Sequence, residues 1–163
     1  MRRWMAGFIL CTCTGSVVAQ VAPAAAETAR YTGVLAAAAR GDAAEIARLA
    51  ATGANVNVRD DYGRTPLHVA TFGGHRDAIA ALVKAKAEPG ALERDRYDAV
   101  TIAAVADDVA TLRVLLQLGA SAKLVTSRYE GTALIAAAHL GHEQVVKLLI
   151  AAGAPLDHVN NLG

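Results

Sequence analysis

One residue pattern returns along this chain at an interval of 33 or 34 residues, and it limits the possible folds more than any other feature. Three independent columns share the interval: Ala54, Ala87, Ala120 and Ala154; Leu49, Leu82, Leu115 and Leu149; and Gly41, Gly74 and Gly141, with Asp107 in the slot between the last two. Repeats of this length are typical of stacks in which each unit packs only against its neighbours. The sequence therefore predicts a repeat array over residues 34–163.

Each repeat is predicted to contain a short helix followed by a longer one. In the second unit Pro66 suits the first turn of a helix, because its missing N–H would be unpaired there. Gly73 and Gly74 can end this helix in the left-handed conformation. Apolar residues then recur at helical spacing, at Ala78, Ile79, Leu82 and Val83. Hydrophobic residues make up 54% of the chain but aromatic ones only 4%, which favours close helix–helix packing through small side chains.

The stretch GRTPLHVATFGGH, followed by a leucine-bearing helix and GANVN, resembles the ankyrin repeat. The resemblance implies an all-α solenoid of stacked helix-turn-helix units with extended turns. It also implies that Thr65 and His68 bond locally and that the histidine helps to tie neighbouring turns. The expected units span about 34–60, 61–93, 94–127 and 128–160, followed by the start of a further unit.

Two units depart from the family pattern. In the third unit Asp98 takes the place of the threonine and Asp107 the place of a glycine, and in the fourth Gly131 comes one position late. These departures leave the stacked architecture as the expectation but put the geometry of the turns in question.

The N-terminal 26 residues have the composition of a secretory signal peptide. MRR is a positively charged start, WMAGFILCTCTGSVV is an apolar run, and AQVAPAAA ends in small residues. We expect cleavage after Ala26, or after Ala19 at a second site, with residues 27–33 as a short lead. The exported product would be periplasmic or secreted and would not insert into a membrane.

Two alternatives to a cleaved signal stay open. The segment could be retained as a membrane anchor, although its apolar run is shorter than the roughly 20 residues of a span. It could also carry a lipid on Cys13, although Thr12 fits that signal poorly. Cys11 and Cys13 both lie here, so the rest of the chain has no thiol for a disulfide, a zinc site or nucleophilic catalysis.

No catalytic, cofactor-binding or metal-binding residues are predicted. His139 and His142 form an H-x-x-H pair, but Gly141 breaks the helix between them and no third ligand lies nearby, as zinc would require. Acidic pairs such as Asp107-Asp108 are better explained as helix caps. Removing Arg2 and Arg3 leaves 14 of the 16 basic residues against 15 acidic ones, which gives no basic face for nucleic acid.

A non-enzymatic protein-binding module is the predicted function, because a repeat stack presents a concave face and a row of turn tips to a partner. On the resemblance, four candidate contact residues end the first helices: Phe72, Val105, His139 and Leu140. Six more lie in the turns, where tyrosine and arginine are typical interface anchors: Tyr62, Arg64, Arg96, Tyr97, Arg128 and Tyr129. The alternative for the turns is structural, with the arginines paired to Asp60, Asp95 or Glu130.

Two other functions are weighed against the periplasmic module. The chain could be a secreted effector that binds foreign proteins, or a metal-dependent enzyme or an accessory subunit of one. The last helix, EQVVKLLIAAG, has the apolar pattern of an interior repeat. We therefore expect either continuation through a further repeat or end-to-end self-association.

Overall fold

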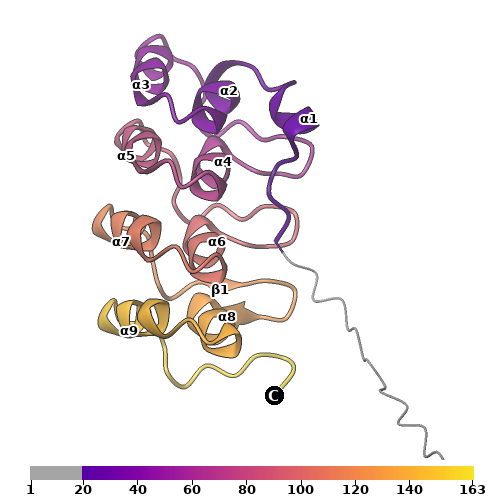
Figure 1. Ribbon diagram of the computed structural model, residues 1–163, viewed down its shortest axis with the longest axis vertical. Helices are drawn as coiled ribbons and strands as arrows, with labels where there is room; N and C mark the ends of the chain where they lie inside the picture. Colours follow the sequence, from indigo (N-terminus) through magenta and orange to yellow (C-terminus); the bar gives the residue numbers. More distant parts are fainter. Residues whose placement is uncertain (1–19) are drawn as a thin grey trace, which may run out of the picture.

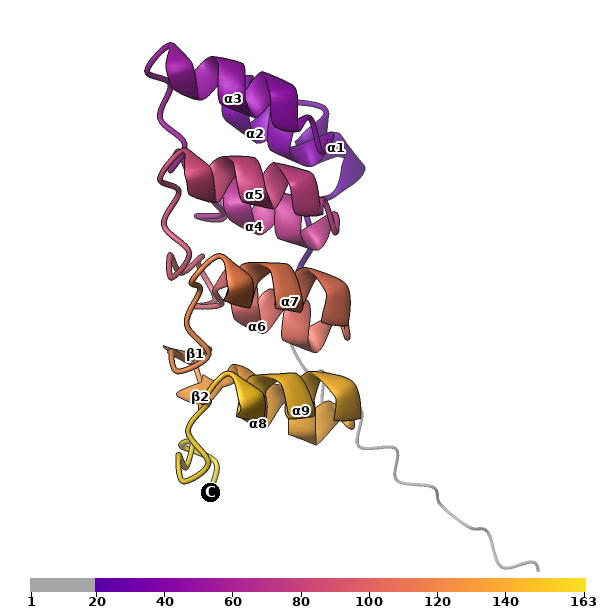
Figure 2. The ribbon, with the colours of Figure 1, turned by 90° about the vertical axis from the view of Figure 1, so that its left-hand side faces the viewer.

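Two columns of helices run side by side through the stack that residues 20–163 form in this computed structural model (Figure 1), and only these residues are described. The first helices of the units form one column and the second helices the other (Figures 1 and 2). The four pairs are α2 (Gly33–Ala39) with α3 (Ala43–Ala51), α4 (Pro66–Phe72) with α5 (Arg76–Lys84), α6 (Ala99–Val105) with α7 (Val109–Gln117), and α8 (Ala133–Leu140) with α9 (Glu143–Ala151). The predicted solenoid of helix pairs is confirmed.

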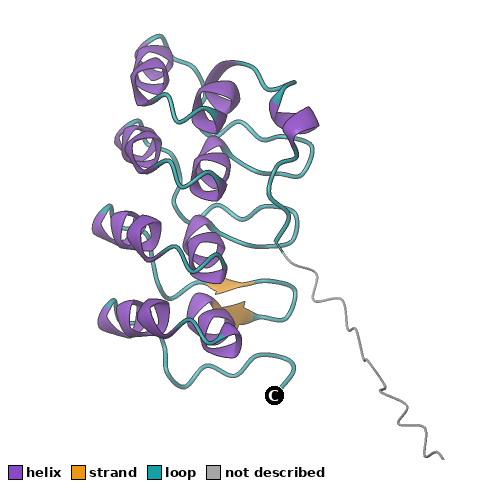
Figure 3. Ribbon diagram, in the orientation of Figure 1, coloured by secondary structure: helices purple, strands orange, loops and turns teal. Residues whose placement is uncertain are grey.

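Extended turns join the units and project to one side of the helices (Figure 3). The turn before α8 closes as a two-stranded antiparallel hairpin of β1 (Val125–Thr126) and β2 (Gly131–Thr132). Its register pairs Val125 with Thr132 and Thr126 with Gly131. The fold therefore remains all-α, with the strands confined to one turn.

Side-chain caps begin several of the helices where the sequence predicts them. The carboxylates of Asp42 and Asp108 each accept a hydrogen bond of 2.9 Å from the backbone N–H three residues later, at the starts of α3 and α7. Thr132 caps α8 in the same way, and Pro66 occupies the first turn of α4. Such caps satisfy backbone donors that a helix cannot pair internally.

The core lies between the two columns and consists mainly of alanine, leucine and valine. One alanine column, at Ala37, Ala70, Ala103 and Ala137, is buried where the first helices of neighbouring units meet. Larger side chains fill the space between the second helices, with Ile46, Ile79, Leu112 and Val145 all fully buried. Each unit thus completes its core with its neighbours, as the repeat interval predicts.

The departures from the repeat pattern keep the left-handed residues in place. Gly41, Gly74 and Gly141 have φ of 70°, 63° and 77°, and Asp107 adopts the same left-handed region at 54°. Glu130 stands in the place of Gly63 and likewise has φ of 55°, against 73° for the glycine. The turn before α8 differs at Ser127, which has φ of 64° in the place of Asp60 and Glu93. The non-glycine residues in the left-handed region carry strain.

A lead of residues 20–32 precedes the stack and contains the short helix α1 (Ala25–Thr28). It lies against the turns of the first units, on the side away from the second helices (Figure 1). The predicted signal segment, with its apolar run, Cys11 and Cys13, lies mostly outside the described residues. Within residues 20–163 no helix is long and apolar enough to cross a membrane.

Candidate functional site

The turns form a continuous row because each one bonds to the next through the backbone. The N–H of Arg94 donates to the carbonyl of Tyr62 at 3.0 Å, and Ser127 donates to Arg96 at 2.8 Å. The last turn continues the series with a 3.1 Å bond from Asn161 to Tyr129. The candidate turn residues therefore lie on one connected edge of the stack.

A side-chain acceptor shapes the tip of each turn. One carboxylate oxygen of Asp60 accepts the N–H groups of Tyr62 and Arg64, both at 2.9 Å. Glu93 holds the N–H groups of Asp95 and Tyr97 in the same way, both at 3.0 Å. These acceptors recur at the repeat interval and fix the direction in which the neighbouring tyrosines project.

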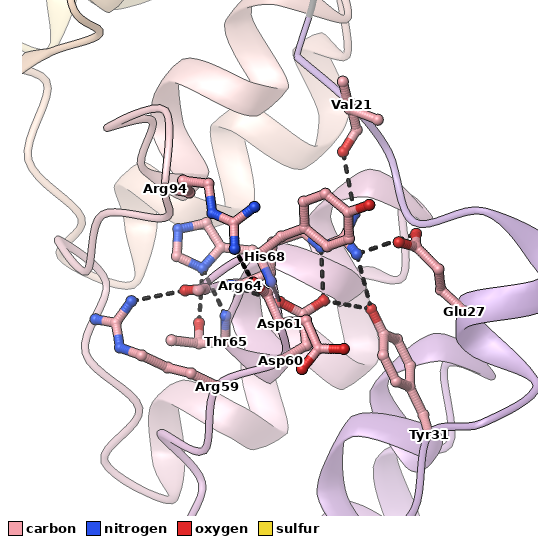
Figure 4. Close-up of polar contacts among 12 residues, drawn as sticks. Val21, Glu27, Tyr31, Arg59, Asp60, Asp61, Arg64, Thr65, His68 and Arg94 are labelled. Carbon is pink, nitrogen blue, oxygen red and sulfur yellow. Dashed lines mark hydrogen bonds and ion pairs between the residues drawn. The ribbon is translucent and has the colours of Figure 1, made fainter.

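Arg64 is not a surface contact, which corrects the prediction for this residue. Its side chain is only 2% exposed, and its guanidinium donates to Asp60 at 2.7 Å and to Glu27 at 3.1 Å. Further donations reach the carbonyl of Val21 at 3.2 Å and the hydroxyl of Tyr31 at 3.3 Å (Figure 4). The lead covers this arginine, so the structural alternative of an Arg64–Asp60 pair is the one observed.

The buried charges around Arg64 are mutually stabilised. Burial alone would raise the pKa of Asp60, but hydrogen bonds from Tyr31 and Arg64 lower it below its usual range. Burial raises the pKa of Tyr31, and its 2.6 Å hydrogen bond to Asp60 raises it further. The phenol therefore stays protonated and serves as a donor to Asp60 while it accepts from Arg64. We name this set of Arg64, Asp60, Glu27, Tyr31 and the Val21 carbonyl the arginine clasp.

The lead also borders the other candidates of the second unit and Tyr97 of the third. A cavity of about 140 Å³ is bordered by Gln20 and Val21 of the lead and by Tyr62, Phe72 and Tyr97. Phe72 and Tyr97 are half-buried, whereas Tyr62 is 40% exposed. The ring of Tyr62 contacts the guanidinium groups of Arg64 and Arg94, with centroid distances of 4.5 and 5.1 Å.

Most candidates of the fourth unit, and Arg96 of the third, are accessible to solvent. Tyr129 is 38% exposed and Leu140 is 45% exposed, and Arg96 and His139 are also exposed. Arg128 forms an ion pair with Asp95, but its side chain remains 55% exposed. Val105 is half-buried. This part of the edge therefore combines the predicted residue types with access to solvent.

The histidines hold the backbone together, as predicted for His68. Its Nδ1 accepts the Thr65 N–H at 3.0 Å, so its Nε2 carries the proton and donates to the carbonyl of Tyr97 in the next unit at 3.1 Å. Burial lowers the pKa of His68 to about 4, which keeps the ring neutral. His75 and His142 bond through Nε2 to carbonyls of the preceding unit, at 3.2 and 3.1 Å.

Among residues 20–163 no three histidine, cysteine or acidic side chains cluster closely enough to bind an ion. His142 lies 3.7 Å from Asp107 and bonds to Val105, and His139 is exposed. The H-x-x-H pair thus has no third protein ligand in this part of the chain.

Sequence reasoning missed the residues of the lead that hold Arg64. Glu27 and Tyr31 are separated from Arg64 by 37 and 33 positions, and Val21 contributes only a backbone carbonyl. No local spacing connects such groups. The one available signal was the acidic Glu27 close to an otherwise uncharged segment, QVAPAAA.

Comparisons with known proteins match the helix-pair repeats. A family model for ankyrin repeats in many copies matches residues 34–83, and the model for the single ankyrin repeat matches residues 130–161. The third unit, with its Asp98 and Asp107, lies between these two matches.

Curated relatives share the same repeats. A B-cell lymphoma 3 protein homolog from Mus musculus is 35% identical over 108 residues, which cover 64% of this chain and 24% of that protein. The putative ankyrin repeat protein YahD from Escherichia coli is 29% identical over 117 residues, which cover 72% of this chain and 58% of the relative. The chain therefore spans less than two thirds of the length of either protein.

Proposed function

The chain belongs to the ankyrin-repeat family, and from that premise we propose that it binds its protein partner through the turn tips and concave face of the third and fourth units. Members of this family are protein–protein interaction modules. This surface is chosen because the lead buries Arg64 and partly covers Phe72 in the second unit. Asp95 and Tyr97 at the start of the third unit also border the lead, whereas Tyr129 and Leu140 of the fourth unit are exposed.

The residue types on that surface support partner binding. Tyr129 and Leu140 are large and exposed, and Arg96 and Arg128 can form several hydrogen bonds with a partner. Tyrosine and arginine often supply a large share of the binding energy at protein interfaces. The exposed Arg128–Asp95 pair is weak enough to rearrange when a partner arrives.

Export to the periplasm is the second part of the proposal. It is supported by the positively charged start, the short apolar run and the small residues of the N-terminal segment. If the chain is exported, its partner should be sought among periplasmic proteins.

Self-association through the last unit is the third part. It is supported by the exposure of Ile150, Leu156, Val159 and Leu162, between 46% and 72%. Sedimentation of the chain at increasing concentration should show a rising average mass. A constant monomer mass would contradict this part alone.

Affinity capture from periplasmic extract, with the chain without its signal segment as bait, tests partner binding. Tyr129→Ala and Leu140→Ala should each lower the affinity for the captured partner about tenfold. This is the scale of roughly 1–2 kcal/mol that is usual for interface anchors. Arg113→Ala is the matched control, because Arg113 is an exposed arginine on α7, in the opposite column. Denaturant unfolding of each variant separates loss of affinity from loss of fold.

Two outcomes of the capture experiment would contradict the proposed surface. One is a partner that tolerates both Tyr129→Ala and Leu140→Ala. The other is a loss of affinity with Arg113→Ala as large as with the two surface variants.

A further inference from the structure

We propose that the signal segment is removed between Ala19 and Gln20, and that the mature chain keeps residues 20–32 as a structural part of the repeat stack. The proposal rests on the proposed export. Of the two cleavage sites in the sequence, the one after Ala19 keeps all the described residues that form contacts with the folded repeats. Residues 20–26, which cleavage after Ala26 would discard, take part in the arginine clasp and its cover.

A buried guanidinium needs hydrogen-bond acceptors from the protein. Arg64 is 2% exposed, so donors that lose a protein acceptor cannot readily turn to water. The lead supplies the Val21 carbonyl, the Glu27 carboxylate and the Tyr31 hydroxyl, each within 3.3 Å of the guanidinium. Asp60, the remaining partner, lies four residues before Arg64 in the same turn.

Cleavage after Ala26 would remove contacts that hold Arg64 and Glu27. The Val21 carbonyl, which is the acceptor of Nη1 among residues 20–163, would be lost. Glu27 would also lose the Ala24 N–H that donates to its carboxylate at 2.7 Å, a bond that lowers the pKa of Glu27. The new α-ammonium group would add a positive charge on Glu27, the residue that pairs with Arg64. Cleavage after Ala19 leaves every one of these contacts in place.

Cleavage after Ala19 would make Gln20 the N-terminal residue. Its side chain borders the cavity with Tyr62, Phe72 and Tyr97, and its Nε2 is buried without a hydrogen-bond partner among the described residues. An N-terminal glutamine can cyclise: the α-amino nitrogen attacks Cδ, a lactam C–N bond forms, and Nε2 leaves as ammonia. Cyclisation would remove the one buried amide nitrogen that has no partner here. We therefore expect the mature N-terminus to be pyroglutamate.

Intact mass and N-terminal sequencing of the product exported from the full chain test the cleavage site. The expected mass is that of residues 20–163 less one ammonia, with a blocked N-terminus. A free amine at Gln20 would support the cleavage site and overturn the cyclisation. A product that begins at Glu27 or Met1 would overturn the cleavage site. Absence of any exported product would instead overturn the proposed export.

A comparison of residues 20–163 with residues 27–163, both produced directly, tests the structural reason without export. The unfolding constant of the shorter chain should be larger by about tenfold or more, as expected when a charged group loses a hydrogen bond. Val21→Ala in the longer chain is the matched control, because it keeps the carbonyl and should change stability little. Equal stability of the two chains would overturn the structural role of residues 20–26.

Discussion

Two turns of this molecule carry the same pair of residue types and use them differently. In the turn before α4, Arg64 is 2% exposed and lies in the arginine clasp beneath the lead. In the turn before α8, Arg128 is 55% exposed and pairs only with Asp95. The tyrosines beside them, Tyr62 and Tyr129, have nearly the same exposure, at 40% and 38%. Tyr62 and Tyr129 occupy the same position in their turns, but Arg64 follows its tyrosine by two residues whereas Arg128 directly precedes its own. Only the arginine that lies beneath the lead is structural.

The physical difference lies in the cost of desolvation. A buried ion depends on its partners because water cannot replace them, so the loss of one partner is expensive. An exposed ion pair exchanges readily with water and contributes little. The predictions below test this contrast from the largest expected effect to the smallest.

Arg64→Ala should produce the largest loss of stability. It leaves the Asp60 and Glu27 carboxylates without their common cation, and the expected cost is about 3–5 kcal/mol of unfolding free energy. Arg128→Ala removes the exposed, ion-paired arginine of the other turn and should cost at most about 1 kcal/mol. Urea unfolding at neutral pH measures both. Similar losses of unfolding free energy in the two variants would show that the buried arginine stabilises the fold no more than the exposed one.

Acid should destabilise the protein through His68. Its pKa is lowered from 6.5 to about 4 in the folded state, so its contribution is fully present above pH 6.5 and is lost as the pH falls towards 4. The shift corresponds to about 3 kcal/mol at one pKa unit per 1.36 kcal/mol. The equivalent position in the third unit is Thr101, whose hydroxyl bonds to that of Thr126 at 2.9 Å and does not titrate.

Urea unfolding should therefore show that the free energy of unfolding falls more steeply between pH 7.5 and pH 4 for the natural chain than for His68→Gln. Burial raises the pKa of Asp98, so this carboxyl favours the folded state as the pH falls and opposes His68. Because Asp98 is present in both chains, the difference between them isolates the histidine. Parallel stability curves for the two chains would show that His68 does not carry the effect.

Tyr31→Phe should have an intermediate effect. The hydroxyl of Tyr31 donates to Asp60 and accepts from Arg64, so its removal should cost about 1.5–3 kcal/mol, as for hydrogen bonds to charged groups. Tyr129→Phe is the control, since within residues 20–163 its hydroxyl has no hydrogen-bond partner and the side chain is 38% exposed. Thermal unfolding of the two variants gives the comparison, and an equal change in midpoint would argue against a role for the clasp hydroxyl.

The sequence predicts the repeated parts of this molecule well because their causes are local. Pro66, the aspartate caps and the buried alanine column act within one unit or between adjacent ones, and each recurs at the repeat interval. The tie between His68 and Tyr97 follows from the family resemblance and is also present. These features needed no knowledge of distant contacts.

The arginine clasp could not be predicted in this way. Its partners join the lead to the second unit over 33 to 43 positions, and one of them is a backbone carbonyl that any residue could supply. The turn geometry of the third unit was also open. It is preserved because Asp98 caps α6 through the Thr101 N–H at 2.8 Å, and Asp107 adopts the left-handed conformation.

The smallest predicted effect is a gain in stability from Asp107→Gly. Asp107 has φ of 54° in a column that elsewhere holds glycine, and a residue with a Cβ is strained in this conformation. Glycine relieves the strain but also increases the freedom of the unfolded chain, so the net gain should be at most about 1 kcal/mol.

Gly141→Asp is the reverse change at the equivalent position of the last unit. Its φ is 77°, and a Cβ added there would meet no atom within 4 Å, so the backbone conformation alone should set the cost. We expect a loss of about 1 kcal/mol, opposite in sign to Asp107→Gly. If Asp107→Gly also lowers stability, the 3.7 Å approach of Asp107 to His142 outweighs the strain, and the third unit has compensated for its missing glycine rather than merely tolerated it.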